Sequence, residues 1–190
     1  MIGSRSAERA EAAAADLRAS LPVEADIAGA VNVDAATAAE IVVVAVPWEG
    51  HEALVRDLAA ALAGKIVIDC VNPLGFDKLG AFPLPVPEGS AAEQASRLLP
   101  DSRVVAAFHH VSAVLLLDPA VDEVDTDVLV LGDDRDATDA VQALVADIPR
   151  MRGVYAGRLR NAGQVEALTA NLISVNRRYK AHAGLRVTDV

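Results

Sequence analysis

The stretch IVVVAVPWEGHEALVRDLAAALAGKIVIDC, residues 41–70, decides the fold class of this chain. It opens with a continuous run of β-branched residues that ends at Pro47 and closes with a second apolar run, KIVIDC (65–70). Runs of this kind are typical of strands buried on both faces of a parallel sheet. Residues 50–62 between them have helical spacing and are followed by Gly64, a residue type that commonly ends helices. A parallel pair of strands needs such a crossover, so the stretch predicts a strand, helix, strand unit.

Helices and strands alternate on both sides of this unit. Residues 6–21 are almost all helix formers and stop before Pro22, and a short helix is expected within 31–40 with Asp34 as its N-cap. Further along, strands are predicted at 103–108, 128–131 and 153–155, and helices at 90–99, 136–146 and 161–176. Ser90 and Glu93 form a capping box at the start of the first of these helices. Together they predict an α/β fold with a doubly wound, mostly parallel sheet.

One long connection interrupts the alternation, VNPLGFDKLGAFPLPVPEG (71–89). Its prolines and glycines argue against regular structure over much of its length. Connections this long are uncommon inside a compact domain and are usually functional or disordered. The segment is therefore a candidate part of the functional site.

Composition narrows the class of protein further. Hydrophobic residues make up 53% of the chain and aromatic residues 3%, as in Ala-rich helices around Val-rich strands. The formal charge of -10 argues against a nucleic-acid partner. The single Cys70 excludes an internal disulfide and a multi-cysteine zinc site. We recognise no signal peptide and no membrane-spanning run, so we expect a cytoplasmic protein without a membrane partner.

The tripeptide Gly3-Ser4-Arg5 stands where a strand would end and a helix begin. An arginine at the end of the second strand of a dinucleotide-binding sheet accommodates the 2′-phosphate of NADP, whereas an acidic residue there accepts the ribose hydroxyls of NAD. The guanidinium of Arg5 can hold phosphate through two bonds, and Ser4 and the helix amides can add to it. The alternative is that Ser4 or Ser6 is an ordinary N-cap and that Arg5 and Arg9 are surface cations.

Three further dipeptides follow strands, at the sheet edge where doubly wound folds bind ligands. The side chain of Trp48, after Pro47, either packs against a ring or ribose or closes the edge of the core. Asn72, before Pro73, either offers its amide to a nicotinamide carboxamide or forms an ordinary turn. Both interpretations remain open for each residue.

The third dipeptide is His109-His110. Adjacent residues on an extended segment point in opposite directions, so the pair does not suit one metal ion, and we predict no metal site. A single imidazole beside a cofactor ring is the preferred interpretation. Cys70 has no helix N-terminus or cation next to it in the sequence to activate it, which favours a place in the core.

Taken together, seven stretches resemble the NADPH-dependent F-420 reductase family: IGSRSAERA, VVVAVPWEGH, KIVIDCVNPLGFDK, PVPEGSAAEQ, VVAAFHHVSA, VLVLGDD and RLRNAGQVEALTANLISVN. These enzymes pass hydride between NADP and the deazaflavin coenzyme F-420. The resemblance covers essentially the whole chain. It implies a Rossmann-type NADP-binding domain over residues 1–113 and a small C-terminal lobe over 114–190 that closes the coenzyme cleft and supports a homodimer.

The resemblance also implies roles for single residues. Ser4, Arg5 and Arg9 would bind the 2′-phosphate of NADP. Pro47 and Trp48 would border its adenosine and ribose, and Asn72, Pro73, His109 and Ala113 would lie around the nicotinamide and the deazaflavin. Transfer of hydride between two rings needs them stacked and shielded from water, so no catalytic acid or base is expected.

The chain departs from the family pattern at its start. Family members begin with a strand and a loop resembling G-x-G-x-x-G, which lets the backbone approach the pyrophosphate, and we find neither here. We expect a misplaced start, with about 25 further residues in the natural protein by the usual size of a strand, loop and helix unit, rather than a degenerate remnant. The alternatives are another NADP-linked Rossmann reductase, acting on an imine or keto acid, or a non-catalytic nucleotide-binding or interaction module.

Overall fold

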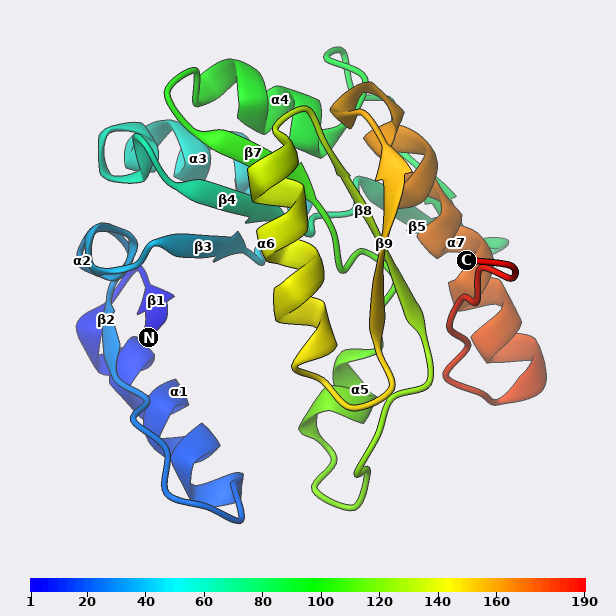
Figure 1. Cartoon of the computed structure of the whole chain (residues 1–190), viewed down its shortest axis with the longest axis horizontal. Coiled ribbons are helices and arrows are strands. Elements are labelled where there is room, and N and C mark those ends of the chain that lie inside the picture. The colour runs from blue at the N-terminus through cyan, green and yellow to red at the C-terminus, as the bar shows by residue number, and fades with distance from the viewer.

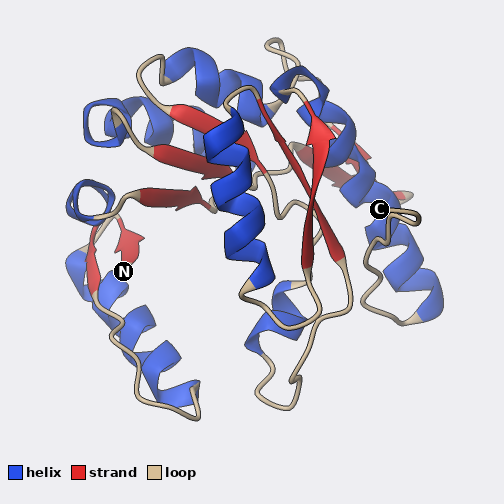
Figure 2. Ribbon diagram, viewed as in Figure 1, coloured by secondary structure: helices blue, strands red, loops and turns tan.

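The structure, a computed structural model, describes all 190 residues and has an α/β fold built around one five-stranded sheet (Figures 1 and 2). The strands of this sheet, in spatial order, are β3 (Ile41–Val44), β4 (Ile66–Asp69), β7 (Arg103–Ala106), β8 (Asp127–Gly132) and β9 (Arg152–Gly157). Neighbouring strands are parallel except β7 and β8. The predicted α/β class with a mostly parallel sheet is confirmed.

Helices cover both faces of this sheet. They are α3 (Trp48–Leu62), α4 (Ala91–Leu98) and α6 (Arg135–Ala146). Successive residues of a strand point to opposite faces, so Val67 packs with α3 and α4 while Ile66 and Ile68 pack with α6. The strand β4 is buried along its whole length. The helix α3 ends before Gly64, whose φ of 76° is a left-handed conformation that favours glycine.

The first residues form a separate small unit, which we call the N-terminal arm (residues 1–31). It contains β1 (Ile2–Ser4), α1 (Ala7–Ser20) and β2 (Gly29–Val31), and its two strands pair only with each other. Of the two serines considered as N-caps, Ser6 caps α1 by accepting a hydrogen bond from the amide of Arg9. The arm joins the rest of the molecule through α2 (Asn32–Ala38).

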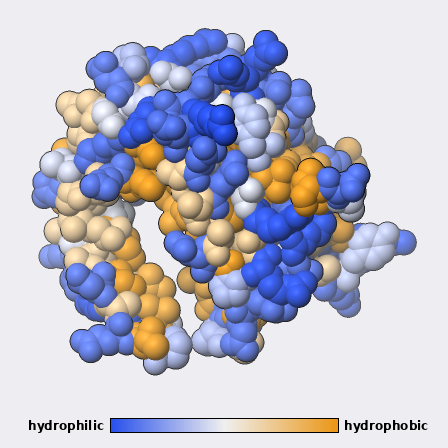
Figure 3. All heavy atoms as spheres, in the orientation of Figure 1, coloured by the Kyte–Doolittle hydropathy of each residue, from blue (hydrophilic) through white to orange (hydrophobic).

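An opening separates the N-terminal arm from the five-stranded sheet. Figure 3 shows it between the arm and the body, with hydrophobic side chains along its walls. The strand β3 pairs with β4 on one side only, and Val43 is 49% exposed. The expectation that residues 41–47 form a strand buried on both faces is therefore wrong, because β3 is an edge strand.

Two further expectations are corrected. Asp34 does not cap α2, since the helix begins at Asn32 and Asp34 lies within its first turn. The segment 71–89 is not irregular throughout, because it contains a β-hairpin of β5 (Leu74–Asp77) and β6 (Gly80–Pro83). Hydrogen bonds from the amides of Leu79 and Gly80 to the carboxylate of Asp77 close its turn.

The C-terminal part completes the sheet and adds a long helix. The short helix α5 (Ala113–Leu117) precedes β8, and α7 (Ala162–Tyr179) follows the 3-10 turn η1 (Leu159–Asn161) and packs beside the hairpin. The final residues return to the sheet, where the buried carboxylate of Asp127 accepts hydrogen bonds from Arg152, Arg186 and the amide of Val187.

Candidate functional site

A cavity of about 360 Å³ lies where the end of β1 approaches the connection from β3 to α3. Its lining consists of Gly3, Ser4, Arg5, Asn32, Val46, Pro47, Gly50 and Leu54. Arg5 takes part in no ion pair of the structure, and Ser6 rather than Ser4 caps α1. The structure therefore brings together Ser4, Arg5 and Pro47 and leaves the guanidinium free to bind an anion. We call this space the Arg5 cavity.

Two residues predicted beside this cavity do not line it. Arg9 lies in the first turn of α1 and is exposed, outside the cavity lining. Trp48 is half-buried against the hydrophobic core and stacks on His51, with ring centroids 5.5 Å apart. Of the two interpretations open for Trp48, this placement favours closing the edge of the core.

His51 on α3 and Asp69 at the end of β4 form a fully buried pair. The Nε2 atom of His51 lies 2.6 Å from Asp69 Oδ2, and its Nδ1 atom lies 2.9 Å from Gln94 Oε1. Both ring nitrogens face oxygen acceptors, which favours the doubly protonated imidazolium. Burial lowers the pKa of His51, but the hydrogen bond and charge of Asp69, helped by Gln94, outweigh it and raise that pKa above its usual value.

The same carboxylate orders the turn that follows β4. Asp69 Oδ1 accepts a hydrogen bond of 3.0 Å from the amide of Val71, and Asn72 comes next. Asn72 Nδ2 donates to the carbonyl of His109 at 2.9 Å, and the hydroxyl of Thr169 on α7 lies 3.1 Å from that carbonyl and 3.2 Å from Asn72 Oδ1. The ends of β4 and β7 are thus tied to each other and to α7, and we call this region the ring side of the site.

The imidazole of His109 is an unsatisfied group on the ring side, and the adjacent His110 is likewise buried without a partner for either ring nitrogen. His109 is 4% exposed, and neither of its ring nitrogens has a hydrogen-bond partner. Burial, opposed in part by Asp69, lowers the pKa of His109 to about 4, so the ring is neutral at neutral pH. A buried polar atom without a partner costs about 1–3 kcal/mol. The preceding Phe108 has a φ of 66°, a strained conformation for this residue type.

Glu166 on α7 connects this helix to the start of α4. It is 3% exposed and accepts hydrogen bonds from the first two amides of α4, at Ala91 (2.9 Å) and Ala92 (3.2 Å). Burial raises the pKa of Glu166 to about 7, although the two amides oppose this shift. Ser90 also caps α4 through the amide of Glu93, as its sequence predicted. These contacts fix α7 against α4 and so hold Thr169 in place.

The two remaining predicted residues differ in their surroundings. Pro73 is buried and follows Asn72, while Ala113 is exposed as the first residue of α5. Sequence reasoning missed His51, Asp69, Gln94 and Thr169. Asp69 did carry a signal, because a carboxylate inside an otherwise apolar buried strand requires a buried partner.

These features first define a class. A doubly wound sheet with a free arginine at one strand end and buried polar groups at neighbouring strand ends is the architecture of dinucleotide-binding proteins of the Rossmann type. Comparisons with known proteins identify the family within this class. Residues 1–73 match the family model described as NADP oxidoreductase coenzyme F420-dependent.

Full-length relatives agree. The F420-dependent NADP reductases of Methanocaldococcus jannaschii and Methanothermobacter marburgensis are each 36% identical to this chain, covering 100% of it and 87% of their own length. A crystal structure of a proposed F420-dependent NADP reductase from Arthrobacter sp. FB24 superposes with a TM-score of 0.81 and 28% identity, over 98% of this chain and 86% of that one. The chain belongs to the F420-dependent NADP oxidoreductase family.

More distant structures share the fold alone. A pyrroline-5-carboxylate reductase from Coxiella burnetii superposes with a TM-score of 0.57 at 14% identity, over 93% of this chain and 56% of that one. None of the helices of the present structure combines the length and the apolar character needed to span a bilayer.

Proposed function

We propose that this protein transfers hydride between NADP(H) and the deazaflavin coenzyme F-420. The observation that carries the proposal is the combination of a free arginine in the Arg5 cavity with an unsatisfied, buried imidazole on the ring side, in one chain of this family. The first suits the phosphate that distinguishes NADP from NAD. The buried imidazole suits a hydrogen bond to a polar ring of a bound coenzyme.

The Arg5 cavity fits the 2′-phosphate end of NADP. The guanidinium of Arg5 binds the phosphate, the hydroxyl of Ser4 donates to it, and Pro47 limits the cavity on the other side. Arg9, one turn along α1, strengthens the positive potential without lining the cavity. Trp48 supports the adenosine side indirectly, by stacking on His51 at the edge of the core next to Pro47.

We assign the two stacked rings to the ring side. The nicotinamide and the deazaflavin supply the hydride chemistry when they are bound, and the protein orients them and excludes water. The neutral imidazole of His109 donates a hydrogen bond to a ring oxygen or nitrogen, which removes the cost of its unsatisfied buried state. Asn72, fixed by Thr169 and the His109 carbonyl, sets the position of the turn that carries Pro73, and Ala113 borders the opposite edge.

The same proposal covers the larger organisation. Residues 1–113 carry the NADP side, and residues 114–190, which bring α7 against the ring side, close the coenzyme cleft. The protein acts on small-molecule coenzymes in the cytoplasm as a homodimer and binds no nucleic acid. The excess of 27 acidic over 17 basic residues supports the last point.

A direct assay tests the reaction. Purified protein is mixed with NADPH and oxidised F-420, and the loss of deazaflavin absorbance is followed, with NADH as the control. We expect turnover with NADPH and much less with NADH. Absence of turnover at any coenzyme concentration would contradict the proposal.

The opening beside β3 favours a second candidate, a non-catalytic nucleotide-binding or interaction module. The exposed edge of β3 offers unpaired backbone groups to another strand. Titration of the single tryptophan, Trp48, with NADP and NAD separates the two candidates when it is read beside the assay. NADP-selective binding without turnover would favour the module.

A further inference from the structure

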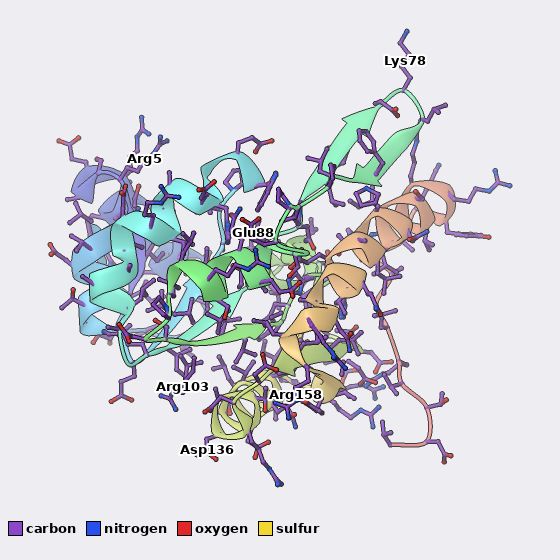
Figure 4. The ribbon with its side chains drawn as sticks, turned by 90° about the horizontal axis from the view of Figure 1, so that it is seen from above. Arg5, Lys78, Glu88, Arg103, Asp136 and Arg158 are labelled. Atoms are coloured by element: carbon purple, nitrogen blue, oxygen red, sulfur yellow. The ribbon has the colours of Figure 1, made fainter.

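A groove of about 550 Å³ lies between the β5–β6 hairpin and the second half of α7, and we call it the hairpin groove. Figure 4 shows the hairpin standing out from the body beside α7, with Lys78 at its tip and Arg5 at the far side of the molecule. Phe76 and Leu79 line it from the hairpin, and Ile173, Arg177 and Arg178 line it from α7. No role proposed above uses these residues.

The two walls of the hairpin groove follow on, along α7 and along the chain, from residues of the ring side. On α7, Thr169, Ile173 and Arg177 follow each other at intervals of four residues and therefore form one ridge along the helix. Arg177 lies eight residues beyond Thr169, about 12 Å along the axis at 1.5 Å per residue. On the other wall, β5 begins two residues after Asn72. A molecule held on the ring side can thus extend directly into the groove.

The charge of the groove differs from that of the whole chain. Arg177 and Arg178 are exposed and take part in no ion pair, although the chain carries a formal charge of -10. Asp77 is the one acidic residue of the lining, and its Oδ1 atom is occupied by the amides of Leu79 and Gly80. The groove therefore presents two adjacent free cations to a ligand.

Helix stability alone does not account for this arrangement. Basic residues in the last turn of a helix interact favourably with its dipole, which is a sufficient reason for one arginine. It gives no reason for the hydrophobic side chains opposite, since Phe76 is 69% and Leu79 is 94% exposed. Cations facing apolar side chains across a groove suit an anionic ligand with a carbon chain.

We propose that the hairpin groove binds the anionic side chain of the deazaflavin coenzyme, with its phosphate held by Arg177 and Arg178. This proposal rests on the proposed function. In F-420 the deazaflavin carries a ribityl chain that ends in a phosphate ester followed by carboxylates. Such a chain spans on the order of 10 Å from ring to phosphate with bonds of about 1.5 Å, close to the separation of Thr169 and Arg177. Phe76 and Leu79 pack against the carbon chain.

The test compares two ligands by fluorescence titration on the full chain, without NADPH. One is F-420, and the other is the ribityl deazaflavin, which lacks the phosphate and everything beyond it. We expect the wild-type protein to bind F-420 at least about tenfold more tightly than the ribityl deazaflavin, because the phosphate adds charge-assisted hydrogen bonds. Raising the salt concentration should reduce this difference.

The decisive variant is the double substitution Arg177→Gln with Arg178→Gln. It should weaken F-420 binding about tenfold or more and leave the affinity for the ribityl deazaflavin within about twofold of the wild-type value, since the lost bonds are to the phosphate. The charge-matched control is Arg103→Gln with Arg135→Gln, two exposed arginines away from the groove. The control should change neither affinity. In steady state the double variant should raise the KM for F-420 and leave kcat and the KM for NADPH unchanged.

Several outcomes would overturn the proposal. Equal wild-type affinity for the two ligands, or equal loss of both in the double variant, would exclude a phosphate site in the groove. A loss of NADPH affinity instead would assign the arginines to NADP. Conversion of a dimer to a monomer in sedimentation, with F-420 affinity intact, would make the groove an interface between copies. Wild-type protein that binds neither deazaflavin would contradict the proposed function itself.

Discussion

The Arg5 cavity and the ring side of the site are built in opposite ways. The cavity is open and takes its cation from the exposed turn between β1 and α1. The ring side is buried, and side chains from α3, β4, α4 and α7 determine its geometry through hydrogen bonds. Surface charge can therefore be altered at the cavity with little effect on folding, whereas ligand binding and stability are coupled on the ring side.

The largest effect should come from breaking the buried pair with Asp69→Ala. Without this carboxylate, burial would lower the pKa of His51 and its ring would become neutral, so the core would lose the ion pair and the hydrogen bonds to His51 and to the amide of Val71, which costs about 3–5 kcal/mol. Urea unfolding measures the loss. Asp16→Ala on the exposed face of α1 is the control and should change the unfolding free energy by less than about 0.5 kcal/mol. Similar small losses in both variants would show that the pair is not a buried ion pair.

A second test uses pH. The folded-state pKa of His109 is lowered to about 4 from the usual 6.5, so the ring is neutral in both states above pH 6.5, and the folded state loses stability relative to the unfolded state as the pH falls from 6.5 towards 4. The size of this shift corresponds to about 3 kcal/mol. In His109→Gln, unfolding free energies measured from pH 7 to 4 should decline less steeply by about that amount.

His51 and Glu166 act in the opposite sense. Burial raises the pKa of Glu166 to about 7, and Asp69 holds the pKa of His51 above its usual value, so both contributions are present at low pH and are lost as the pH rises. The contributions of His51 and Glu166 are present in both the wild-type protein and His109→Gln, so they cancel when the two pH profiles are compared. His182→Gln, at an exposed histidine, is the control, and an unchanged acid slope in His109→Gln would refute the assignment.

At the open end, Arg5→Gln should separate binding from folding. We expect the KM for NADPH to rise about tenfold, through loss of a bidentate bond to phosphate, with kcat almost unchanged. The unfolding free energy should stay within about 0.5 kcal/mol of the wild-type value. Arg9→Gln should raise the KM for NADPH only about twofold, because Arg9 contributes positive electrostatic potential and no direct bond to the phosphate. Equal effects of the two substitutions would show that the cavity does not select the phosphate.

The smallest expected effect is that of Thr169→Val, which keeps the shape of the side chain and removes its hydroxyl. The hydrogen bond to the His109 carbonyl or Asn72 would be lost, at a cost of about 1 kcal/mol. The affinity for deazaflavin and the unfolding free energy should therefore fall together, whereas Arg5→Gln should lower only the affinity for its coenzyme. Thr37→Val on α2 loses only a bond to the backbone of its own helix, at Val33, and should leave deazaflavin affinity unchanged.

The sequence predicted those parts of the molecule that depend on local pattern. The strand, helix, strand unit at 41–70 and the caps at Ser6 and Ser90 follow from neighbouring residues. The edge position of β3 could not be read from its apolar run, because exposure depends on what lies beside the strand. The hairpin was hidden by the prolines and glycines of its loop.

The same distinction applies to the site. Arg5, Asn72 and His109 were found because each stands at a predicted strand end. The partners of Asp69 and Asn72 lie 18 and 97 residues away at His51 and Thr169, and no spacing rule connects them. Only the packed arrangement of helices around the sheet brings these side chains together.

The opening beside β3 affects how readily the N-terminal arm opens locally. The N-terminal arm buries little beyond Ala10 and Ala14 and shares no strand pairing with the body, so it should exchange its amide hydrogens well before the central strands do. A dinucleotide that reaches from Arg5 to the ring side would span this opening and stabilise the joined arrangement by mass action. The coenzyme would then stabilise the structure as well as react. Slower exchange of the amide hydrogens of α1 would report its binding.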